Sequence, residues 1–224
     1  MNYKLFPLGE NAVTIDFGSE ISLALNNKVL RLAAFLAAHS FKGFIEIVPA
    51  YSSLTIFYDV FTVRKNFSDS PTAFAAVKVF LENALPDFSE IERAAPRVVE
   101  IPVCFDAESA LDLDWLAAEK NLAREEVVEI FLEKTYRVFM LGFLPGFAYL
   151  GETDERIAVP RKSVPRLRVP RGSVGIAERQ TGIYPFESPG GWQIIGRTEI
   201  ELFTPNAENP TALQAGDSVK FYEA

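Results

Sequence analysis

The chain has 224 residues, of which 49% are hydrophobic and 23% are charged, a composition typical of a globular protein with one large or two small domains. Its one cysteine, Cys104, excludes a disulfide within the chain, and its one histidine, His39, excludes a zinc site built from histidine and cysteine ligands. No apolar run approaches the roughly 20 residues that span a bilayer, and the N-terminus has no signal-peptide pattern. We therefore expect a cytoplasmic protein that does not associate with membranes.

The first 95 residues predict a small α+β domain in which the elements follow the order β-β-α-β-β-α and the helices cover one face of the sheet. Strands are expected at residues 3–8, 12–17, 44–48 and 54–58, and helices at residues 22–39 and 70–83. The first helix carries one apolar stripe, and His39 lies at its end, where a cation suits the helix dipole. Ser70 is the expected N-cap of the second helix, with Pro71 in its first turn. The stripe consists of Leu25, Val29, Leu32 and Leu36.

Residues 85–96 have proline near both ends and no periodicity, so they predict a linker, and residues 96–224 predict a second domain. A strand is expected at residues 97–105, helices at 112–121 and 123–135, and short strands at 136–141, 173–177, 180–183, 193–195, 200–203 and 218–222. Many short strands between glycine and proline turns predict a closed barrel or a sandwich. Cys104 lies in the first strand, where we expect a buried thiol without a catalytic role, because the one histidine lies in the other domain.

Six cations and no acids lie between Arg156 and Ala177, in a chain whose net charge is −8. The rest of the chain therefore carries 16 cations and 30 acids, a net charge of −14. An acidic protein with one basic strip is a poor candidate for nucleic-acid binding, which usually needs a basic domain. The strip indicates a local anion site, a docking surface for an acidic partner, or an arginine-bearing loop exposed to solvent.

The motifs of several enzyme classes are missing from the sequence. It contains neither the glycine-rich phosphate loop nor the dinucleotide-binding glycine motif. A serine or cysteine nucleophile would need His39 as its base, and His39 lies in the other domain. Arginine, carboxylates, hydroxyls and backbone amides are what remains, and they suit the binding and polarisation of an anionic substrate.

Residues 136–198 combine many glycines with a polar and aromatic set that could line a pocket. Alternatively, the glycines serve only the corners of a small barrel. The polar and aromatic set consists of Tyr149, Gln180, Thr181, Tyr184, Trp192 and Arg197.

The segments GFLPGFAYLG (142–151), VPRGSVGIAERQTGIYPFESPGGWQIIGRT (169–198) and LQAGDSVKF (213–221) resemble the family of the 5-oxoprolinase B subunit, also known as KipI or allophanate hydrolase subunit 1. VPAYSSLTIFYD (48–59) extends the resemblance to nearly the whole chain. The resemblance implies a ferredoxin-like α+β domain in residues 1–95 and a cyclophilin-like β-barrel in residues 96–224. Many relatives carry a histidine where this chain has Phe131, and smaller residues where it has Arg171 and Glu178.

The resemblance also implies a cytoplasmic component of an ATP-dependent 5-oxoprolinase, the complex that opens 5-oxo-L-proline to L-glutamate, and a chain that is inactive alone. The expected partners are a protein like the C subunit of 5-oxoprolinase (allophanate hydrolase subunit 2) and a LamB/YcsF-like A subunit. ATP is expected to bind with or on these partners. Two alternatives stay open: an inhibitor of a sensor histidine kinase, and a subunit of a biotin-dependent allophanate or urea carboxyltransferase.

On this interpretation, Arg161, Arg166 and Arg197 bind the substrate carboxylate or an ATP-derived phosphate, because the planar guanidinium forms paired hydrogen bonds with oxyanions. Other residues are expected to orient the substrate or to form the walls of its site. The sequence identifies neither a catalytic residue nor a metal site. The orienting and wall residues are Gln180, Thr181, Tyr184, Pro145, Gly146, Phe147, Tyr149, Gly190, Gly191 and Trp192.

Overall fold

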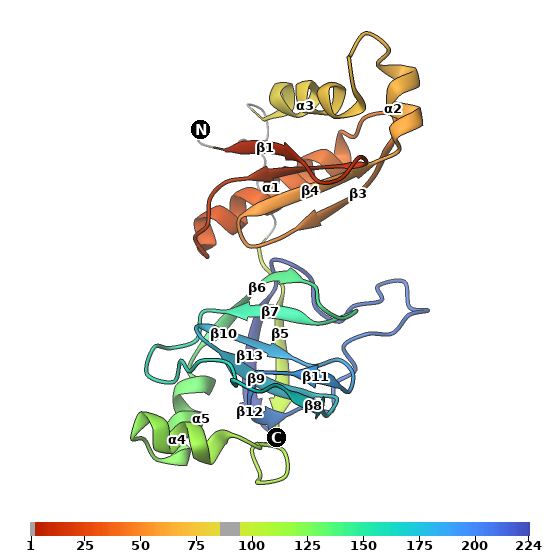
Figure 1. Cartoon of the computed structure of the whole chain (residues 1–224). Helices are drawn as coiled ribbons and strands as arrows, with labels where there is room; N and C mark the ends of the chain where they lie inside the picture. Colours follow the sequence, from red (N-terminus) through yellow and green to blue (C-terminus); the bar gives the residue numbers. More distant parts are fainter. Residues whose placement is uncertain (1–2, 86–94) are drawn as a thin grey trace. The chain divides into compact units, whose positions relative to one another are not determined.

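The computed structural model describes residues 3–85 and 95–224, and the chain divides into two compact units, Met1–Ala95 and Pro96–Ala224 (Figure 1). Each unit has a hydrophobic core of its own. Most of the predicted linker, residues 86–94, lies outside the described residues.

The first unit contains a four-stranded antiparallel sheet in the order β1-β2-β4-β3. Alternate residues of the two central strands point into one core, which also takes the apolar faces of two helices, so the predicted covering of one sheet face is confirmed. The strands are β1 (Lys4–Pro7), β2 (Ala12–Asp16), β3 (Phe44–Pro49) and β4 (Ser53–Tyr58). The helices are α1 (Leu23–Ala38), α2 (Val60–Asn66) and α3 (Ala73–Ala84).

Helix α1 begins and ends as the sequence predicts. The Ser22 hydroxyl accepts a hydrogen bond from the backbone N–H of Leu25 at 3.2 Å, and His39 forms the C-cap, with its Nδ1 3.1 Å from the carbonyl oxygen of Phe35. Three members of the predicted stripe are buried, and Leu25 packs against the same core while partly exposed. The three buried members are Val29, Leu32 and Leu36.

Two details of the following helices differ from the sequence prediction. Helix α2 was not predicted; its N-cap is Asp59, whose carboxylate accepts the N–H of Thr62 at 2.7 Å. The N-cap of α3 is Thr72, not Ser70, and its hydroxyl accepts the N–H of Ala75 at 3.0 Å. Ser70 instead belongs to the turn after α2, where its N–H donates to the carbonyl oxygen of Phe67 at 3.2 Å.

The second unit contains a curled seven-stranded sheet in the order β12-β9-β10-β7-β6-β13-β5, together with a two-stranded ribbon, β8-β11. Its strands are β5 (Val98–Val103), β6 (Thr135–Leu141), β7 (Ala148–Gly151), β8 (Arg166–Val169), β9 (Ser173–Ala177), β10 (Gln180–Ile183), β11 (Ser188–Gly190), β12 (Gln193–Arg197) and β13 (Ser218–Glu223). The sheet forms a half-barrel whose edge strands approach each other at one antiparallel bridge. There, Cys104 and Arg197 exchange backbone hydrogen bonds of 2.8 and 2.9 Å.

Two helices, α4 (Leu113–Lys120) and α5 (Arg124–Leu132), complete the second unit, and both contribute to its core. Helix α5 is shorter than the predicted helix at 123–135, because Thr135 already begins β6. Phe131 is fully buried, and its ring centroid lies 4.9 Å from that of Phe221 and 5.1 Å from that of Tyr136. Phe131 therefore packs in the core.

Two further predictions for this unit are wrong. Residues 200–203 form no strand; Phe203 makes only an isolated bridge with Thr211, and the apolar pattern reflects burial of Leu202 in the core. Cys104 is half-buried rather than buried, and its thiol donates to the Asp106 carboxylate at 2.9 Å. It lies just beyond β5, where the chain turns toward α4, so its thiol reaches a polar surface loop.

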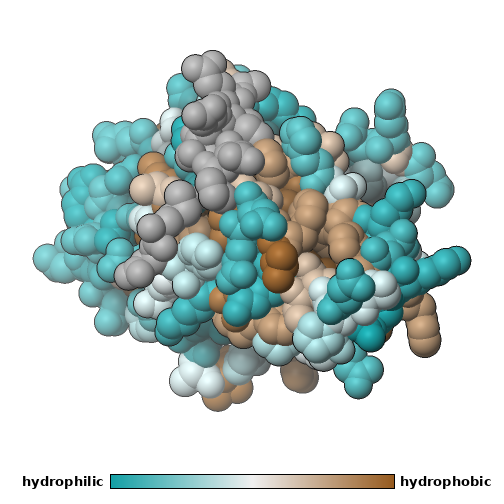
Figure 2. All heavy atoms as spheres, turned by 90° about the horizontal axis from the view of Figure 1, so that it is seen from above, coloured by the Kyte–Doolittle hydropathy of each residue, from teal (hydrophilic) through white to brown (hydrophobic). Residues whose placement is uncertain are grey.

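Figure 2 views the side on which α2 and α3 lie in Figure 1, and apolar side chains gather in its centre, ringed by hydrophilic ones. Phe61 on α2 and Val79 on α3 are among the large apolar side chains exposed in the first unit. None of the helices within the described ranges has the length and apolar character needed to cross a membrane.

The conformation of Gly172 yields a test of the second unit. Its φ is +80°, and a methyl group there would overlap the carbonyl oxygen of Thr198. We expect Gly172→Ala to lower the free energy of unfolding by about 2 kcal/mol or more, since a left-handed backbone and a backbone clash both oppose it. Both tryptophans, Trp115 and Trp192, lie in this unit, so denaturant unfolding followed by tryptophan fluorescence reports on it.

Gly142→Ala is the matched control. Gly142 has no positive φ, and the nearest atom to an added methyl is the flexible Met140 Cε at 3.3 Å. We expect a change within about 0.5 kcal/mol for this variant. Equal unfolding midpoints for the two variants would show that the Gly172 backbone is not constrained as described.

Candidate functional site

A cavity of about 470 Å³ opens in the second unit, and residues of β11 contribute to its lining. This volume is in the range of small-molecule sites, roughly 300–1,000 Å³. Its walls come from the loop before β7, from the β9-β10 hairpin, from the segment before β8 and from the turn after β11. The lining residues are Phe143, Phe147, Tyr149, Arg161, Pro165, Ala177, Glu178, Gln180, Tyr184, Pro189, Gly190, Gly191 and Trp192.

Aromatic rings form the apolar walls of this cavity around Phe147. The Phe147 ring centroid lies 4.9 Å from that of Tyr149, 5.4 Å from that of Tyr184 and 5.6 Å from that of Trp192, each pair meeting edge to face. Such edge-to-face packing fixes the rings relative to one another. The cavity therefore offers a rigid, flat-sided surface against which a small ring could lie.

Tyr184 is held in place by the turn after β11. A side chain at Gly190 would overlap the Tyr184 ring, so only glycine permits this contact. The backbone N–H of Trp192 donates a hydrogen bond to the Tyr184 hydroxyl. The Tyr184 side chain and the turn at residues 190–192 thus hold each other in place. The Tyr184 hydroxyl can still donate its own proton to a ligand.

Both lining tyrosines keep their protons at neutral pH. Burial raises the pKa of Tyr184, and the Trp192 N–H and the Arg161 charge oppose the shift without cancelling it. Burial likewise raises the pKa of Tyr149, again opposed by Arg161. Both tyrosines therefore contribute neutral phenols rather than phenolates to the lining of the cavity.

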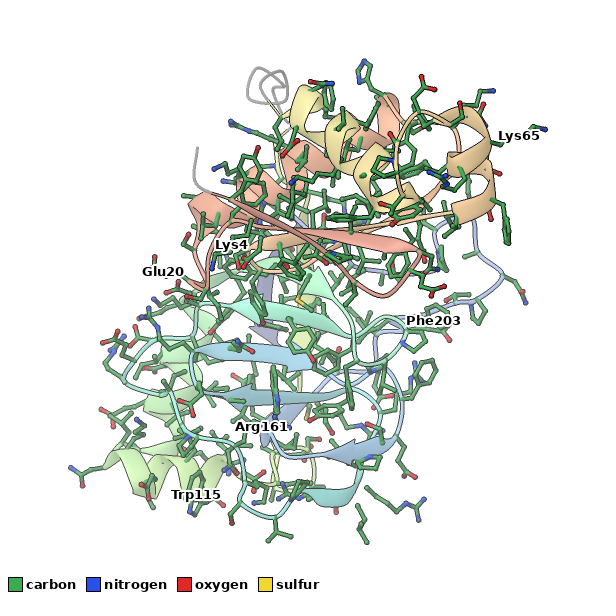
Figure 3. All side chains as sticks on the ribbon, turned by 45° about the horizontal axis from the view of Figure 1, so that its top comes forward. Lys4, Glu20, Lys65, Trp115, Arg161 and Phe203 are labelled. Carbon is green, nitrogen blue, oxygen red and sulfur yellow. The ribbon has the colours of Figure 1, made fainter. Side chains whose placement is uncertain are left out.

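Arg161 is the cation of the cavity lining. Its neighbour Lys162 donates a backbone hydrogen bond of 2.7 Å to the carbonyl oxygen of Gly191, which lays this segment along the turn after β11. A methyl group at Gly191 would lie 3.6 Å from Arg161 Nε, so the guanidinium passes directly over that glycine. Figure 3 labels Arg161 on this segment, and Trp115, on α4, lies elsewhere in the unit. Across the described part of the chain, Arg161 forms no ion pair.

Arg166 does not line the cavity, because the buried carboxylate of Asp112 engages it. The guanidinium donates two hydrogen bonds to Asp112, of 2.6 and 2.8 Å, and Lys162 Nζ lies 3.1 Å from the same carboxylate. The backbone N–H of Ile194 donates a further bond of 2.7 Å. Burial alone would raise the pKa of Asp112, but the hydrogen bonds from Arg166, Ile194 and Lys162 outweigh it and hold that pKa below its ordinary value.

Four other residues expected at the site also lie outside the cavity lining. Thr181 is fully buried on the opposite face of β10, where its hydroxyl donates to the carbonyl oxygen of Gly175 at 2.9 Å. Arg197 ends β12 beside Cys104, with its guanidinium 3.5 Å from the Glu199 carboxylate. Pro145 and Gly146 shape the loop that carries Phe147, and a side chain at Gly146 would meet the carbonyl oxygen of Leu202 at 2.8 Å.

The structure brings the other expected site residues together in the lining. They are Arg161, Gln180, Tyr184, Phe147, Tyr149, Gly190, Gly191 and Trp192. Sequence reasoning did not place Phe143, Pro165, Ala177, Glu178 or Pro189 there. The position of Glu178 could have been predicted from the sequence. The predicted strands 173–177 and 180–183 leave only Glu178 and Arg179 between them, so this acid must lie in the hairpin that connects the two strands. In the described ranges, no three of the His, Cys, Asp and Glu side chains are grouped so as to hold a metal ion.

A family model described as carboxyltransferase domain, subdomain C and D, matches residues 3–213. The chain belongs to this family. A 5-oxoprolinase B subunit from Bacillus subtilis is 46% identical over 222 residues, covering 99% of this chain and 92% of that protein. The corresponding 5-oxoprolinase B subunit from Escherichia coli O157:H7 is 36% identical, covering 97% and 94%.

Among solved structures, that of TTHA0988 is similar with a TM-score of 0.79 and 34% identity. The match covers 95% of this chain but only 40% of the TTHA0988 chain. This member of the carboxyltransferase C/D family thus corresponds to part of a longer chain in one relative, and to nearly the full length of the B subunits.

The ion cluster at Asp112 yields a prediction for stability. Asp112→Asn should lower the free energy of unfolding of the second unit by about 2–3 kcal/mol at pH 7, because Arg166 and Lys162 lose their common partner while staying partly exposed. The matched control is Asp114→Asn on the same helix, whose side chain is 79% exposed in its pair with Arg124 and should change stability by less than about 0.5 kcal/mol.

The same substitution should change the acid sensitivity of the second unit. The folded pKa of Asp112 is below the unfolded value of about 3.9, so the unfolded chain takes up the proton first as the pH falls. The stabilisation is therefore present above about pH 4 and is lost as the pH falls through the folded pKa. Denaturant midpoints at pH 7 and pH 3 should show a smaller gap between wild type and Asp112→Asn at pH 3. An unchanged gap would contradict the role assigned to this carboxylate.

Proposed function

We propose that the chain is the B subunit of an ATP-dependent 5-oxoprolinase, the enzyme that opens the lactam ring of 5-oxo-L-proline to give L-glutamate. The observation that carries the proposal is the similarity, over nearly the full length of both chains, to proteins named as B subunits of 5-oxoprolinase. A cytoplasmic location accords with this proposal.

The chemistry of the cavity suits this substrate. 5-Oxo-L-proline is a small five-membered ring with one carboxylate, a lactam carbonyl and a ring N–H. Arg161 can bind the carboxylate through its planar guanidinium, and the Phe147 and Trp192 rings offer a flat apolar surface to the ring of the substrate. Tyr184 and the amide of Gln180 supply neutral donors for the lactam oxygen.

On this proposal, the chain binds and polarises the lactam. Donors directed at the carbonyl oxygen stabilise the negative charge that develops there when the amide is attacked, and they act best when held rigidly in a partly dry site. The hydrogen bond from Trp192 to the Tyr184 hydroxyl supplies that rigidity. The described residues that line the cavity include no serine, cysteine, lysine or histidine, so the attacking group comes from outside this lining.

The same lining does not fit a nucleoside triphosphate. A triphosphate carries several negative charges, whereas the cavity offers one guanidinium, from Arg161, opposed by the carboxylate of Glu178. We therefore assign ATP binding to the partner proteins. These are the protein like the C subunit of 5-oxoprolinase and the LamB/YcsF-like A subunit, without which this chain is inactive.

We also propose a ferredoxin-like fold for the first unit and a cyclophilin-like barrel for the second. In the first unit, β2, α1 and β3 form a parallel crossover with β4 between the strands, as in a ferredoxin-like domain, but the edge strand β1 comes first in the chain rather than last. The curl of the seven-stranded sheet, with its edges bridged at Cys104 and Arg197, supports a cyclophilin-like barrel in the second unit.

The proposal predicts the effect of removing the Arg161 guanidinium. Glutamate and phosphate release from 5-oxo-L-proline and ATP should require this chain together with both partner proteins. Arg161→Ala should lower kcat/KM by about ten- to a hundredfold, the loss expected for a charged hydrogen bond to a carboxylate. A coupled glutamate assay measures both effects.

Arg168→Ala is the matched control, because Arg168 lies on the β8 strand in an exposed pair with Glu187 and outside the lining. It should retain full activity. Full glutamate release without this chain, or an unaltered kcat/KM for Arg161→Ala, would disprove the proposal. Inhibition of the reaction by avidin would favour the biotin-dependent carboxyltransferase instead.

A further inference from the structure

Glu178 is the one acid that lines the cavity, and it lies in the tip of the β9-β10 hairpin. Ala177 and Gln180 are paired across the two strands, so Glu178 and Arg179 form a two-residue hairpin loop. Gln180 lines the cavity next to it. The hairpin thus carries two polar side chains to the same opening.

The backbone of Glu178 has a conformation that a glutamate rarely adopts. Its φ is +53°, in the left-handed region, where an L-residue is disfavoured by contact between its Cβ and the backbone. The favoured two-residue hairpin turns require a positive φ at the first central position, which glycine, asparagine or aspartate usually occupies. Glutamate at this position is thus unfavourable for folding, and such outliers gather at ligand sites.

The backbone at the tip of the hairpin joins Glu178 to the segment that carries Arg161, and both side chains line the cavity. The backbone N–H of Glu178 donates to the carbonyl oxygen of Val159 at 2.7 Å, which joins the hairpin tip to the segment that carries Arg161. Neither the Arg161 nor the Glu178 side chain has an ion-pair partner in residues 3–85 and 95–224. The cavity wall therefore carries one cation and one anion, both free to meet a ligand.

We propose that Glu178 is a specificity-determining residue that accepts a hydrogen bond from the ring N–H of a lactam carboxylate. The inference rests on the proposed function. In that proposal Arg161 binds the carboxylate of the substrate, and Glu178 is the group that binds its ring N–H. An ionised carboxylate only accepts hydrogen bonds, so it favours a ring N–H and disfavours a ring oxygen, whose lone pairs face it. Arg161 alone would bind any small carboxylate; Glu178 selects those with a donor in the ring.

The same carboxylate suits the product. When water opens the ring, the carbon–nitrogen bond breaks, the carbonyl carbon takes the oxygen of water, and the nitrogen takes protons and becomes an ammonium group. That ammonium forms at the position of the ring N–H, beside Glu178, while the α-carboxylate stays with Arg161. Glu178 can therefore accept a hydrogen bond from the neutral ring N–H of the substrate and then from the ammonium group of the product, without a change in its own position.

The test compares 5-oxo-L-proline with its lactone analogue, 5-oxotetrahydrofuran-2-carboxylate, in which oxygen replaces the ring N–H. Isothermal titration calorimetry on the full chain should give a Kd about tenfold or more lower for the lactam, because a site built around a hydrogen bond rejects an analogue that lacks the donor. Glu178→Ala should bring the two Kd values within about twofold of each other. Glu187→Ala, an exposed acid outside the cavity, should keep the wild-type preference.

A stability measurement separates a ligand role from a structural one. Glu178→Asn tolerates the left-handed backbone better than glutamate, so its midpoint of thermal unfolding should equal or exceed that of wild type while its shorter side chain loses the lactam preference. A preference that survives in Glu178→Ala, or an unfolding midpoint that falls in Glu178→Asn, overturns the inference and leaves 5-oxo-L-proline binding intact. Failure of the wild-type chain to bind 5-oxo-L-proline overturns the proposed function itself.

Discussion

The carboxylate of Asp112 organises the half of the second unit that carries the cavity. It lies at the start of α4 and accepts hydrogen bonds from the backbone of β12 and from two cations of the basic strip, Lys162 and Arg166. Because it is buried, each of these bonds is stronger than it would be in water, and losing one partner would leave charge uncompensated. Helix, sheet and basic strip are thereby fixed to one another at a single point.

The position of Arg161 follows from this anchor. Lys162, its neighbour in the chain, is held both by Asp112 and by the backbone of Gly191, so the Arg161 guanidinium is laid across the turn that closes the cavity. Within the basic strip, Lys162 and Arg166 therefore hold the structure through Asp112, whereas Arg161 faces the cavity. On the proposed function, that cation, together with Glu178 and the neutral tyrosine hydroxyls, binds a small ring bearing a carboxylate.

Sequence reasoning succeeded where the determining contacts are local. Helix α1 followed from its apolar stripe, and the aromatic, polar and glycine residues of 136–198, together with the family resemblance, predicted eight of the thirteen residues that line the cavity. It failed where contacts between residues far apart in the sequence determine the position of a side chain or a strand. Arg166 was expected to meet a ligand, but its partner Asp112 lies 54 residues away in the chain. Residues 200–203 have a strand-like pattern, because burial of Leu202 in a loop produces the same apolar signal as a strand.

We propose that the cavity of this chain binds 5-oxo-L-proline, and the two tryptophans allow a direct measurement of this binding. Trp192 lines the cavity, whereas Trp115 lies on α4 and is 44% exposed. A ¹⁵N-labelled chain should therefore give one indole signal that shifts saturably as 5-oxo-L-proline is added, that of Trp192, and one that does not, that of Trp115. Two unmoved indole signals at saturating ligand, or equal shifts of both, would contradict the account.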